Sequence, residues 1–224
     1  MPPPLEIIHE DNHLLVVNKP SGLATQGVIE GVESVVTLAK EYLKRKHQKP
    51  GNVYLGVVSR LDAPVSGLLV LARTSKAAAR LNEQFKAGSV DKSYWALVEH
   101  FPDPPAGELS HWLLKNDKER RINVVPPRTR GAQQARLTYK LLGKRQLGAL
   151  VEVALLTGRK HQIRVQLADI SCPILGDRKY GSRAAFTSSS AIALHCVRLA
   201  LDHPTTKKRL EFHAPPPRNW KLPP

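Results

Sequence analysis

The segment Ser59-Arg60-Leu61-Asp62 places a carboxylate two positions after an arginine, just ahead of the apolar run from Gly67 to Ala72. In an extended backbone, side chains two positions apart point to the same side, so Arg60 and Asp62 would lie together. A neighbouring guanidinium favours the ionised form of a carboxyl group, and a fixed, ionised aspartate is a candidate nucleophile or general base. Arg-x-Asp pairs near strands are usually surface or structural ion pairs, so this pattern alone favours that interpretation over catalysis.

The net charge indicates the kind of partner. The chain has 34 lysines and arginines against 19 acidic residues, a net charge of +15 and a pI near 10.1. Basic clusters stand at residues 44–46, 118–121, 128–136, 159–160 and 207–209. Such an excess indicates a polyanionic partner, and nucleic acid is favoured over an anionic membrane because no basic amphipathic helix stands out. Each cluster alone is more often a solvated surface than a binding site.

Composition predicts a globular chain of one domain. Apolar residues make up 42% of the 224 residues, and no apolar run approaches the roughly 20 residues that span a bilayer. The first residues lack the pattern of a secretory signal, which favours the cytoplasm. Cys172 and Cys196 are far apart, so we expect two reduced, partly buried thiols and no zinc site.

Periodicity and capping residues predict more strands than helices. Helices are expected at residues 34–46, 75–86 and 160–170, the second between a cap at Thr74 or Ser75 and a stop at Gly88. Strands are expected at residues 5–8, 13–18, 53–58, 67–72, 91–99, 121–125, 135–142, 149–155, 191–201 and 208–212. Because strands and helices do not alternate regularly, the class is α+β with a mostly antiparallel sheet.

The segment from Ser59 to Leu69 resembles the central motif of the RluA-type RNA pseudouridine synthases, His-Arg-Leu-Asp-x-x-Thr-Ser-Gly-Leu-Leu. Further segments resemble other motifs of this family in the same order, over roughly residues 5 to 217. They are residues 10–22, the Lys-x-Tyr strand at 92–96, Thr-Gly-Arg-Lys-His-Gln-Ile-Arg-Val at 157–165, residues 173–177, 194–195 and 203–204. Several motifs in one order are far more specific than any one of them.

The resemblance implies a long mixed β-sheet with helices flanking a basic, central RNA-binding cleft. It predicts one catalytic domain over residues 1–224, with no accessory RNA-binding domain in front of it. The implied partner is tRNA or ribosomal RNA, with no membrane, and a monomer is the default prediction. The implied reaction converts uridine in RNA to pseudouridine and needs no cofactor or metal, because the base stays bound throughout.

The resemblance also assigns three catalytic residues. Asp62 is the essential carboxylate, which attacks sugar or base or removes a proton. Arg164 is its guanidinium partner, and Tyr94 lies against the target base. Without the resemblance, an exposed helical arginine and a half-buried strand tyrosine would be the preferred interpretations.

The other implied site residues contact the RNA. Arg60 fills the space of the flipped uridine or binds the backbone nearby, and Ile163 forms an apolar side of the base pocket. The candidates for phosphate contacts or for shaping the cleft are Lys92, Arg159, Lys160, His161 and Gln162. A lone histidine such as His161 is more often structural.

Two positions depart from the family motif, and two other functions compete with it. Ser59 stands where the family has histidine, and Val65 where it has threonine. Ser59 affects a supporting contact of the RNA-binding loop rather than the catalysis itself.

One alternative function is a non-catalytic RNA-binding protein on this fold. The other, a glycosidase, needs a second carboxylate that no comparable motif supplies.

Overall fold

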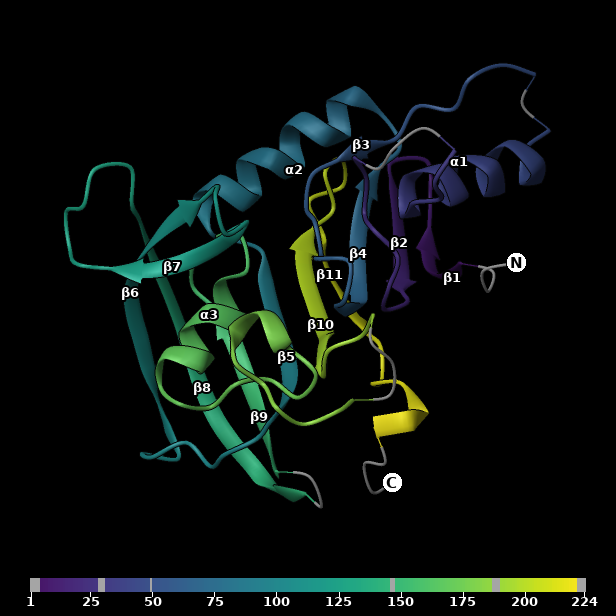
Figure 1. Cartoon of the computed structure of the whole chain (residues 1–224). Helices are drawn as coiled ribbons and strands as arrows, with labels where there is room; N and C mark the ends of the chain where they lie inside the picture. Colours follow the sequence, from purple (N-terminus) through teal and green to yellow (C-terminus); the bar gives the residue numbers. More distant parts are fainter. Residues whose placement is uncertain (1–4, 28–30, 49, 146–147, 187–189, 221–224) are drawn as a thin grey trace. The chain divides into compact units, whose positions relative to one another are not determined.

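The computed structural model describes residues 5–27, 31–48, 50–145, 148–186 and 190–220 (Figure 1). The chain divides into two compact units. The first comprises Met1–Asp91 and Cys196–Pro215, and the second comprises Lys92–His195 and Pro216–Pro224. Each unit is described by itself below. No helix within the described ranges is long and apolar enough to cross a membrane.

The first unit is built on a sheet with two helices. Its strands are β1 (Glu6–Glu10), β2 (Leu14–Lys19), β3 (Gly56–Val57), β4 (Ser66–Ala72), β10 (Leu194–Asp202) and β11 (Arg209–His213). The strand order is β1-β2-β4-β10, with β3 on β4 and β11 on β10. The β1–β2, β2–β4, β3–β4 and β10–β11 pairs are antiparallel. Every residue of β4 is buried, so this strand lies in the core.

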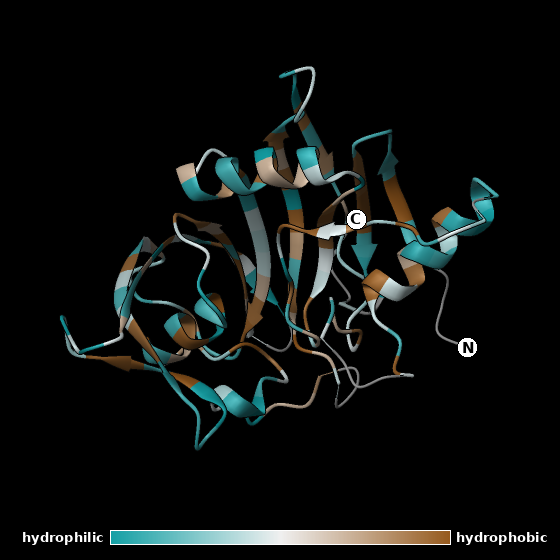
Figure 2. Cartoon of the chain, turned by 90° about the horizontal axis from the view of Figure 1, so that it is seen from above, coloured by the Kyte–Doolittle hydropathy of each residue, from teal (hydrophilic) through white to brown (hydrophobic). Residues whose placement is uncertain are grey.

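The helices of the first unit are α1 (Val35–Lys46) and α2 (Ser75–Ala87). Ser34 and Thr37 form a capping box at the start of α1, which satisfies backbone N–H groups that a helix start leaves unpaired. Thr74 caps α2, and Gly88 ends it in the left-handed conformation that glycine adopts without strain. Figure 2 shows hydrophilic and hydrophobic residues on both helices, the pattern of helices that bury one side only.

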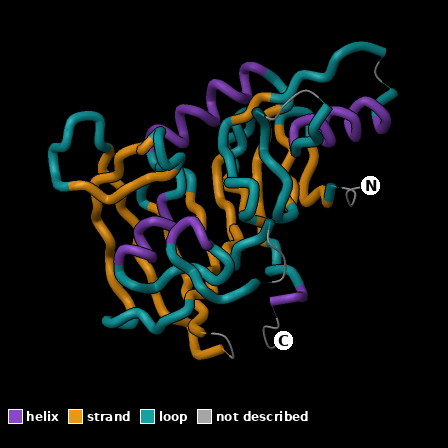
Figure 3. The backbone as a smooth tube through the Cα atoms, in the orientation of Figure 1, coloured by secondary structure: helices purple, strands orange, loops and turns teal. Residues whose placement is uncertain are grey.

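The strands of the second unit are among the orange segments in Figure 3. They are β5 (Asp91–Val98), β6 (Ala106–Asn116), β7 (Arg121–Val125), β8 (Gln133–Arg145) and β9 (Gly148–Leu155). Their order is β5-β9-β8-β6-β7, and each neighbouring pair is antiparallel. Helix α3 (Gln162–Asp169) and the short 3₁₀ helices η1 (Arg178–Tyr180) and η2 (Arg218–Trp220) complete the unit.

These elements confirm the predicted α+β class with antiparallel pairing. Helix α2 and strand β7 begin and end within a residue of the prediction. Strand β6 was missed because its residues alternate only weakly, and its pairing with both β7 and β8 defines it. The predicted strand at residues 53–58 shortens to β3, since only Gly56 and Val57 find a partner in β4. Cys172 and Cys196 are buried thiols that form no disulfide.

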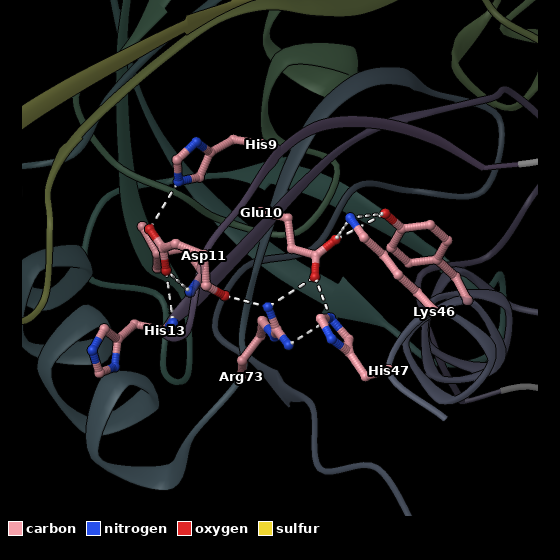
Figure 4. A network of polar contacts seen from close by, with 9 residues as sticks. His9, Glu10, Asp11, His13, Lys46, His47 and Arg73 are labelled. Atoms are coloured by element: carbon pink, nitrogen blue, oxygen red, sulfur yellow. Dashed lines mark hydrogen bonds and ion pairs between the residues drawn. The ribbon is translucent and has the colours of Figure 1, made fainter. Parts of the chain in front are cut away.

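A network of charged side chains joins the end of β1 to α1 and to the residue after β4 (Figure 4). The Glu10 carboxylate accepts hydrogen bonds from Lys46 Nζ at 2.8 Å, Tyr42 Oη at 2.8 Å and Arg73 Nη1 at 2.9 Å. It also contacts His47 Nε2 at 2.7 Å. Burial raises the pKa of Glu10, but these hydrogen bonds and the Arg73 charge outweigh it and lower the pKa to about 2.

Replacing Glu10 with glutamine is expected to remove a pH-dependent part of the stability. A carboxyl group whose pKa is lowered by folding stabilises the protein above its ordinary value of 4.5, and this contribution is lost as pH falls towards about 2. The difference in urea midpoint between wild type and Glu10→Gln should therefore be large at pH 6 and shrink at pH 3. Glu41→Gln, on the exposed side of α1, is the control. A difference that does not change with pH would contradict the role of Glu10.

Candidate active site

Asp62 lies in an irregular segment between β3 and β4 of the first unit. Its side chain is half-buried, and the neighbouring Arg60 is exposed. The Asp62 backbone carbonyl accepts a hydrogen bond from the Val65 N–H at 3.1 Å, which closes a turn before β4. Val65 itself is only 3% exposed, so a methyl group rather than a hydroxyl suits this position. The turn presents Asp62 just ahead of a fully buried strand.

The backbone on both sides of Asp62 is held by the last residue of β2 and by residues of the chain that follows it. Thr25 Oγ1 accepts a hydrogen bond from the Leu61 N–H at 3.2 Å and donates one to the Leu61 carbonyl at 2.9 Å. The Ala63 carbonyl accepts from the Gly22 N–H at 2.8 Å and from Lys19 Nζ at 3.1 Å. Four hydrogen bonds thus fix the peptide groups before and after Asp62, which is the pre-organisation that a catalytic side chain needs.

Lys19 is fully buried at the end of β2. Besides the Ala63 carbonyl, its Nζ donates to the carbonyls of Pro20 at 2.9 Å and Leu23 at 2.7 Å. Burial lowers the pKa of Lys19 to about 7, although the negative charge of Asp62 acts in the opposite direction. The lysine therefore connects the β2 turn to the aspartate segment, 44 residues further along the chain.

Replacing Lys19 with methionine is expected to cost about 2 kcal/mol of unfolding free energy, because three part-buried backbone carbonyls lose their donor. The wild-type advantage should also depend on pH. The folded chain releases this proton at about pH 7, whereas the unfolded chain keeps it up to about 10.5. The unfolded state then binds more protons in this range, so the wild-type advantage rises with pH. Denaturant titrations at pH 7 and 9 test this, with exposed Lys76→Met as control.

The second unit positions the other candidate catalytic residues. Tyr94 is 4% exposed on β5, and Ile163 and Arg164 are 5% and 6% exposed on α3. The alternative of an exposed helical arginine is therefore wrong. Lys92 is half-buried on β5. Arg60 and Asp62 belong to the first unit, so each group of residues is placed within its own unit.

Arg164 forms a buried, bidentate ion pair with Asp177. Its Nε lies 2.7 Å from Asp177 Oδ2, and its Nη2 lies 2.9 Å from Oδ1. Asp177 is 2% exposed. A guanidinium presents two edges with paired N–H donors, and Asp177 takes the edge formed by Nε and Nη2. The position of the Arg164 guanidinium is thus set by a partner within the second unit.

The remaining motif residues, in the loop before α3 and at the first position of α3, differ in solvent exposure. Gln162 is buried, where its Oε1 accepts from Thr157 Oγ1 and the Arg159 N–H, and its Nε2 donates to the Arg136 carbonyl. Arg159 and Lys160 are exposed, although Arg159 Nε donates to a backbone carbonyl at 3.0 Å. Gln162 therefore shapes the loop, and the two cations face solvent.

Sequence reasoning missed three residues that organise these groups: Lys19, Thr25 and Asp177. Lys19 and Asp177 stand in segments that resemble the family motifs, but no charge pattern assigned them a partner. Thr25 gave no signal, because a threonine that bonds a distant backbone looks like any other threonine. All three act through contacts that only the folded chain creates.

Comparisons with known proteins match this chain to one family. The model of the RNA pseudouridylate synthase family matches residues 13–169. The chain is 34% identical over 214 residues to ribosomal large subunit pseudouridine synthase C of Vibrio cholerae, covering 93% of this chain and 65% of that protein. It is 34% identical over 228 residues to synthase D of Zymomonas mobilis, covering 98% of this chain and 71% of that protein. The chain thus spans about two thirds of the length of these relatives.

Solved structures agree in fold. Human RNA pseudouridylate synthase domain containing 4 superposes with a TM-score of 0.77 at 30% identity, covering 95% of this chain and 89% of that chain. Human RNA pseudouridylate synthase domain containing 1 shares the fold, with a TM-score of 0.72. Because a family model, curated relatives and a solved structure agree over most of its length, this chain belongs to the RNA pseudouridylate synthase family.

Proposed function

We propose that this protein converts uridine in RNA to pseudouridine, with Asp62 as the essential carboxylate. The main support for the proposal is that hydrogen bonds hold the backbone beside Asp62 in place. Its motif matches the family, and hydrogen bonds hold the peptide groups on both sides of it. In this reaction the bond from C1′ of ribose to N1 of uracil breaks, and a bond from C1′ to C5 forms. The hydrogen of C5 leaves as a proton, and N1 gains one.

Arg164 and Tyr94 complete the proposed catalytic group. Asp177 holds the Nε and Nη2 edge of Arg164, and we assign Arg164 to the reaction as the guanidinium partner of Asp62. A guanidinium partner can bind a carboxylate through two parallel hydrogen bonds, which directs the carboxylate. We assign Tyr94 to the face of the target base, where its ring supplies stacking and its hydroxyl assists proton transfer. Ile163 then forms an apolar side of the base pocket.

The exposed cations are assigned to the RNA backbone. Three of these cations have exposed side chains that can reach phosphates: Arg60, Arg159 and Lys160. Arg60 is two residues from Asp62 in the sequence, so we also assign it to the space that the target uridine vacates when it flips out of the RNA. Lys92 is assigned to the same backbone. His161 and Gln162 shape the loop that presents these residues. We further propose that both units act as one catalytic domain, as a monomer in the cytoplasm.

The names of the relatives favour ribosomal RNA over tRNA as substrate.

Release of tritium from RNA labelled at C5 of uridine tests the reaction, with bulk RNA from cells that lack this gene. Wild type should release tritium and Asp62→Ala should not, and fractionation of the RNA then identifies the substrate. If wild type releases none from any fraction, including assembled ribosomal particles, the assignment fails and the non-catalytic RNA-binding protein takes its place.

RNA binding is expected to weaken steeply with salt, because lysines and arginines that neutralise phosphates release counterions. Lys160→Ala should reduce the slope of log affinity against log salt by about 1. Lys86→Ala, at the exposed end of α2, removes the same charge and should leave the slope unchanged. Filter binding or fluorescence anisotropy at several salt concentrations measures both. Binding that is indifferent to salt would contradict the proposed phosphate contacts.

A further inference from the structure

Tyr180 ends the short helix η1 in the second unit, outside the residues assigned above to catalysis or RNA binding. Its ring lies under the Arg164 guanidinium, with 5.1 Å from Cζ to the ring centroid. We propose that Tyr180 is a positioning residue that fixes the plane of the Arg164 guanidinium. This inference rests on the proposed function, since it concerns an arginine assigned to the catalytic group.

The ring and the Asp177 carboxylate restrain different motions of Arg164. The bidentate ion pair fixes the position of the guanidinium along its own plane. The pair still permits rotation of this plane about the line that joins the two groups. A cation over an aromatic face is attracted by the negative centre of the ring, so Tyr180 opposes that rotation. The guanidinium plane is thereby held in one orientation.

Both restraints come from one turn of the chain. Asp177 directly precedes η1, and the Tyr180 N–H donates to the Asp177 carbonyl at 3.0 Å. Gly181 closes the turn with φ +95, a backbone conformation suited to glycine. The carboxylate and the ring therefore move as one body, and any shift of this turn would displace both contacts of Arg164 together.

The Tyr180 hydroxyl anchors this turn to two further elements. It accepts a hydrogen bond from the Ile122 N–H of β7 at 3.0 Å. It also lies 2.7 Å from His161 Nδ1, with the two rings in an edge-to-face arrangement. His161 has φ +53, an uncommon conformation for a residue other than glycine, and it directly precedes α3. Through His161, the hydroxyl thus connects the start of α3, the helix that carries Arg164, to the Tyr180 ring that contacts this arginine.

Core packing is the simpler explanation of a buried tyrosine, and Tyr180 does belong to a hydrophobic cluster. The cluster comprises Leu113, Ile122, Ala135, Val165 and Tyr180. Packing alone, however, would require only shape and apolar surface. The guanidinium on the ring face distinguishes Tyr180 from Tyr139, a second buried tyrosine of this unit whose hydroxyl donates to the Pro104 carbonyl at 3.0 Å.

Single-turnover tritium release with saturating enzyme tests the proposal. We expect Tyr180→Leu to lower the rate constant by about 10- to 100-fold, because small displacements of a catalytic group have effects of this size, while RNA affinity stays within about twofold. Tyr180→Phe keeps the ring and should stay within about fivefold of wild type. Tyr139→Leu is the matched control, since it removes a similar buried ring and should lower the melting temperature without lowering the rate.

Pentafluorophenylalanine at position 180 keeps the fold even if Tyr180→Leu does not, because it retains the ring shape of Tyr180→Phe. Its ring face is positive, so the rate should fall at least about fivefold below that of Tyr180→Phe. Equal rates for these two rings would overturn the proposal, as would a Tyr180→Leu rate equal to that of Tyr139→Leu. If wild type itself releases no tritium, the proposed function fails instead, so the two failures are distinguishable.

Discussion

Asp62→Asn is expected to lower the rate of pseudouridine formation by about four orders of magnitude or more, which is the loss found when an essential catalytic group is removed. The amide has nearly the same shape but can neither attack as an anion nor accept a proton at neutral pH. The variant should fold like wild type, because hydrogen bonds to Leu61 and Ala63 hold this segment through its backbone. Rapid-quench assays under single-turnover conditions, followed by nucleoside analysis, measure the rate.

RNA binding should survive in Asp62→Asn, since the affinity comes mainly from phosphate contacts. Loss of one negative charge also changes the net charge, and Glu83→Gln on the exposed side of α2 controls for this change. Glu83→Gln should retain the wild-type rate. An Asp62→Asn protein that isomerises uridine at the wild-type rate would refute the assignment of Asp62, and a protein that no longer binds RNA would indicate a structural role.

Asp177→Ala is expected to cost about 3–5 kcal/mol of unfolding free energy, because it leaves the Arg164 charge buried without this partner. The same change should lower the rate of isomerisation, since the ion pair sets the position of Arg164. Denaturant titrations of wild type, Asp177→Ala, Arg164→Met and the double variant form a thermodynamic cycle. The double variant should be more stable than Asp177→Ala, because no charge is then left buried.

Glu211→Ala provides the matched control for burial. Arg198 and Glu211 form a bidentate pair with contacts of 2.8 Å, similar in geometry to the Arg164 pair, but their side chains are 34% and 43% exposed. Water screens and solvates exposed charges, so Glu211→Ala should cost far less than Asp177→Ala. Equal costs for the two variants would show that burial is not the source of the stability of the Arg164 pair.

Local sequence patterns predicted the ends of an element correctly where neighbouring residues set those ends. Thr74 and Gly88 predicted both ends of α2, because a capping side chain and a left-handed glycine act on the nearest backbone groups. Strand β6 was missed because polar and apolar residues alternate only weakly along it. Its extended backbone is stabilised by pairing with β7 and β8, which come later in the chain. Its identity as a strand is a property of the pairing, not of its own residues.

The sequence by itself determined the family, the α+β class and the motif positions of Asp62, Tyr94 and Arg164, because motif order and periodicity are properties of the chain. Only the tertiary structure decided what holds these residues. Lys19 and Thr25 hold the peptide groups beside Asp62, and Asp177 and Tyr180 hold Arg164. Such contacts join side chains to groups 13 to 44 residues away. They depend on the path of the backbone between those residues, which no local pattern specifies.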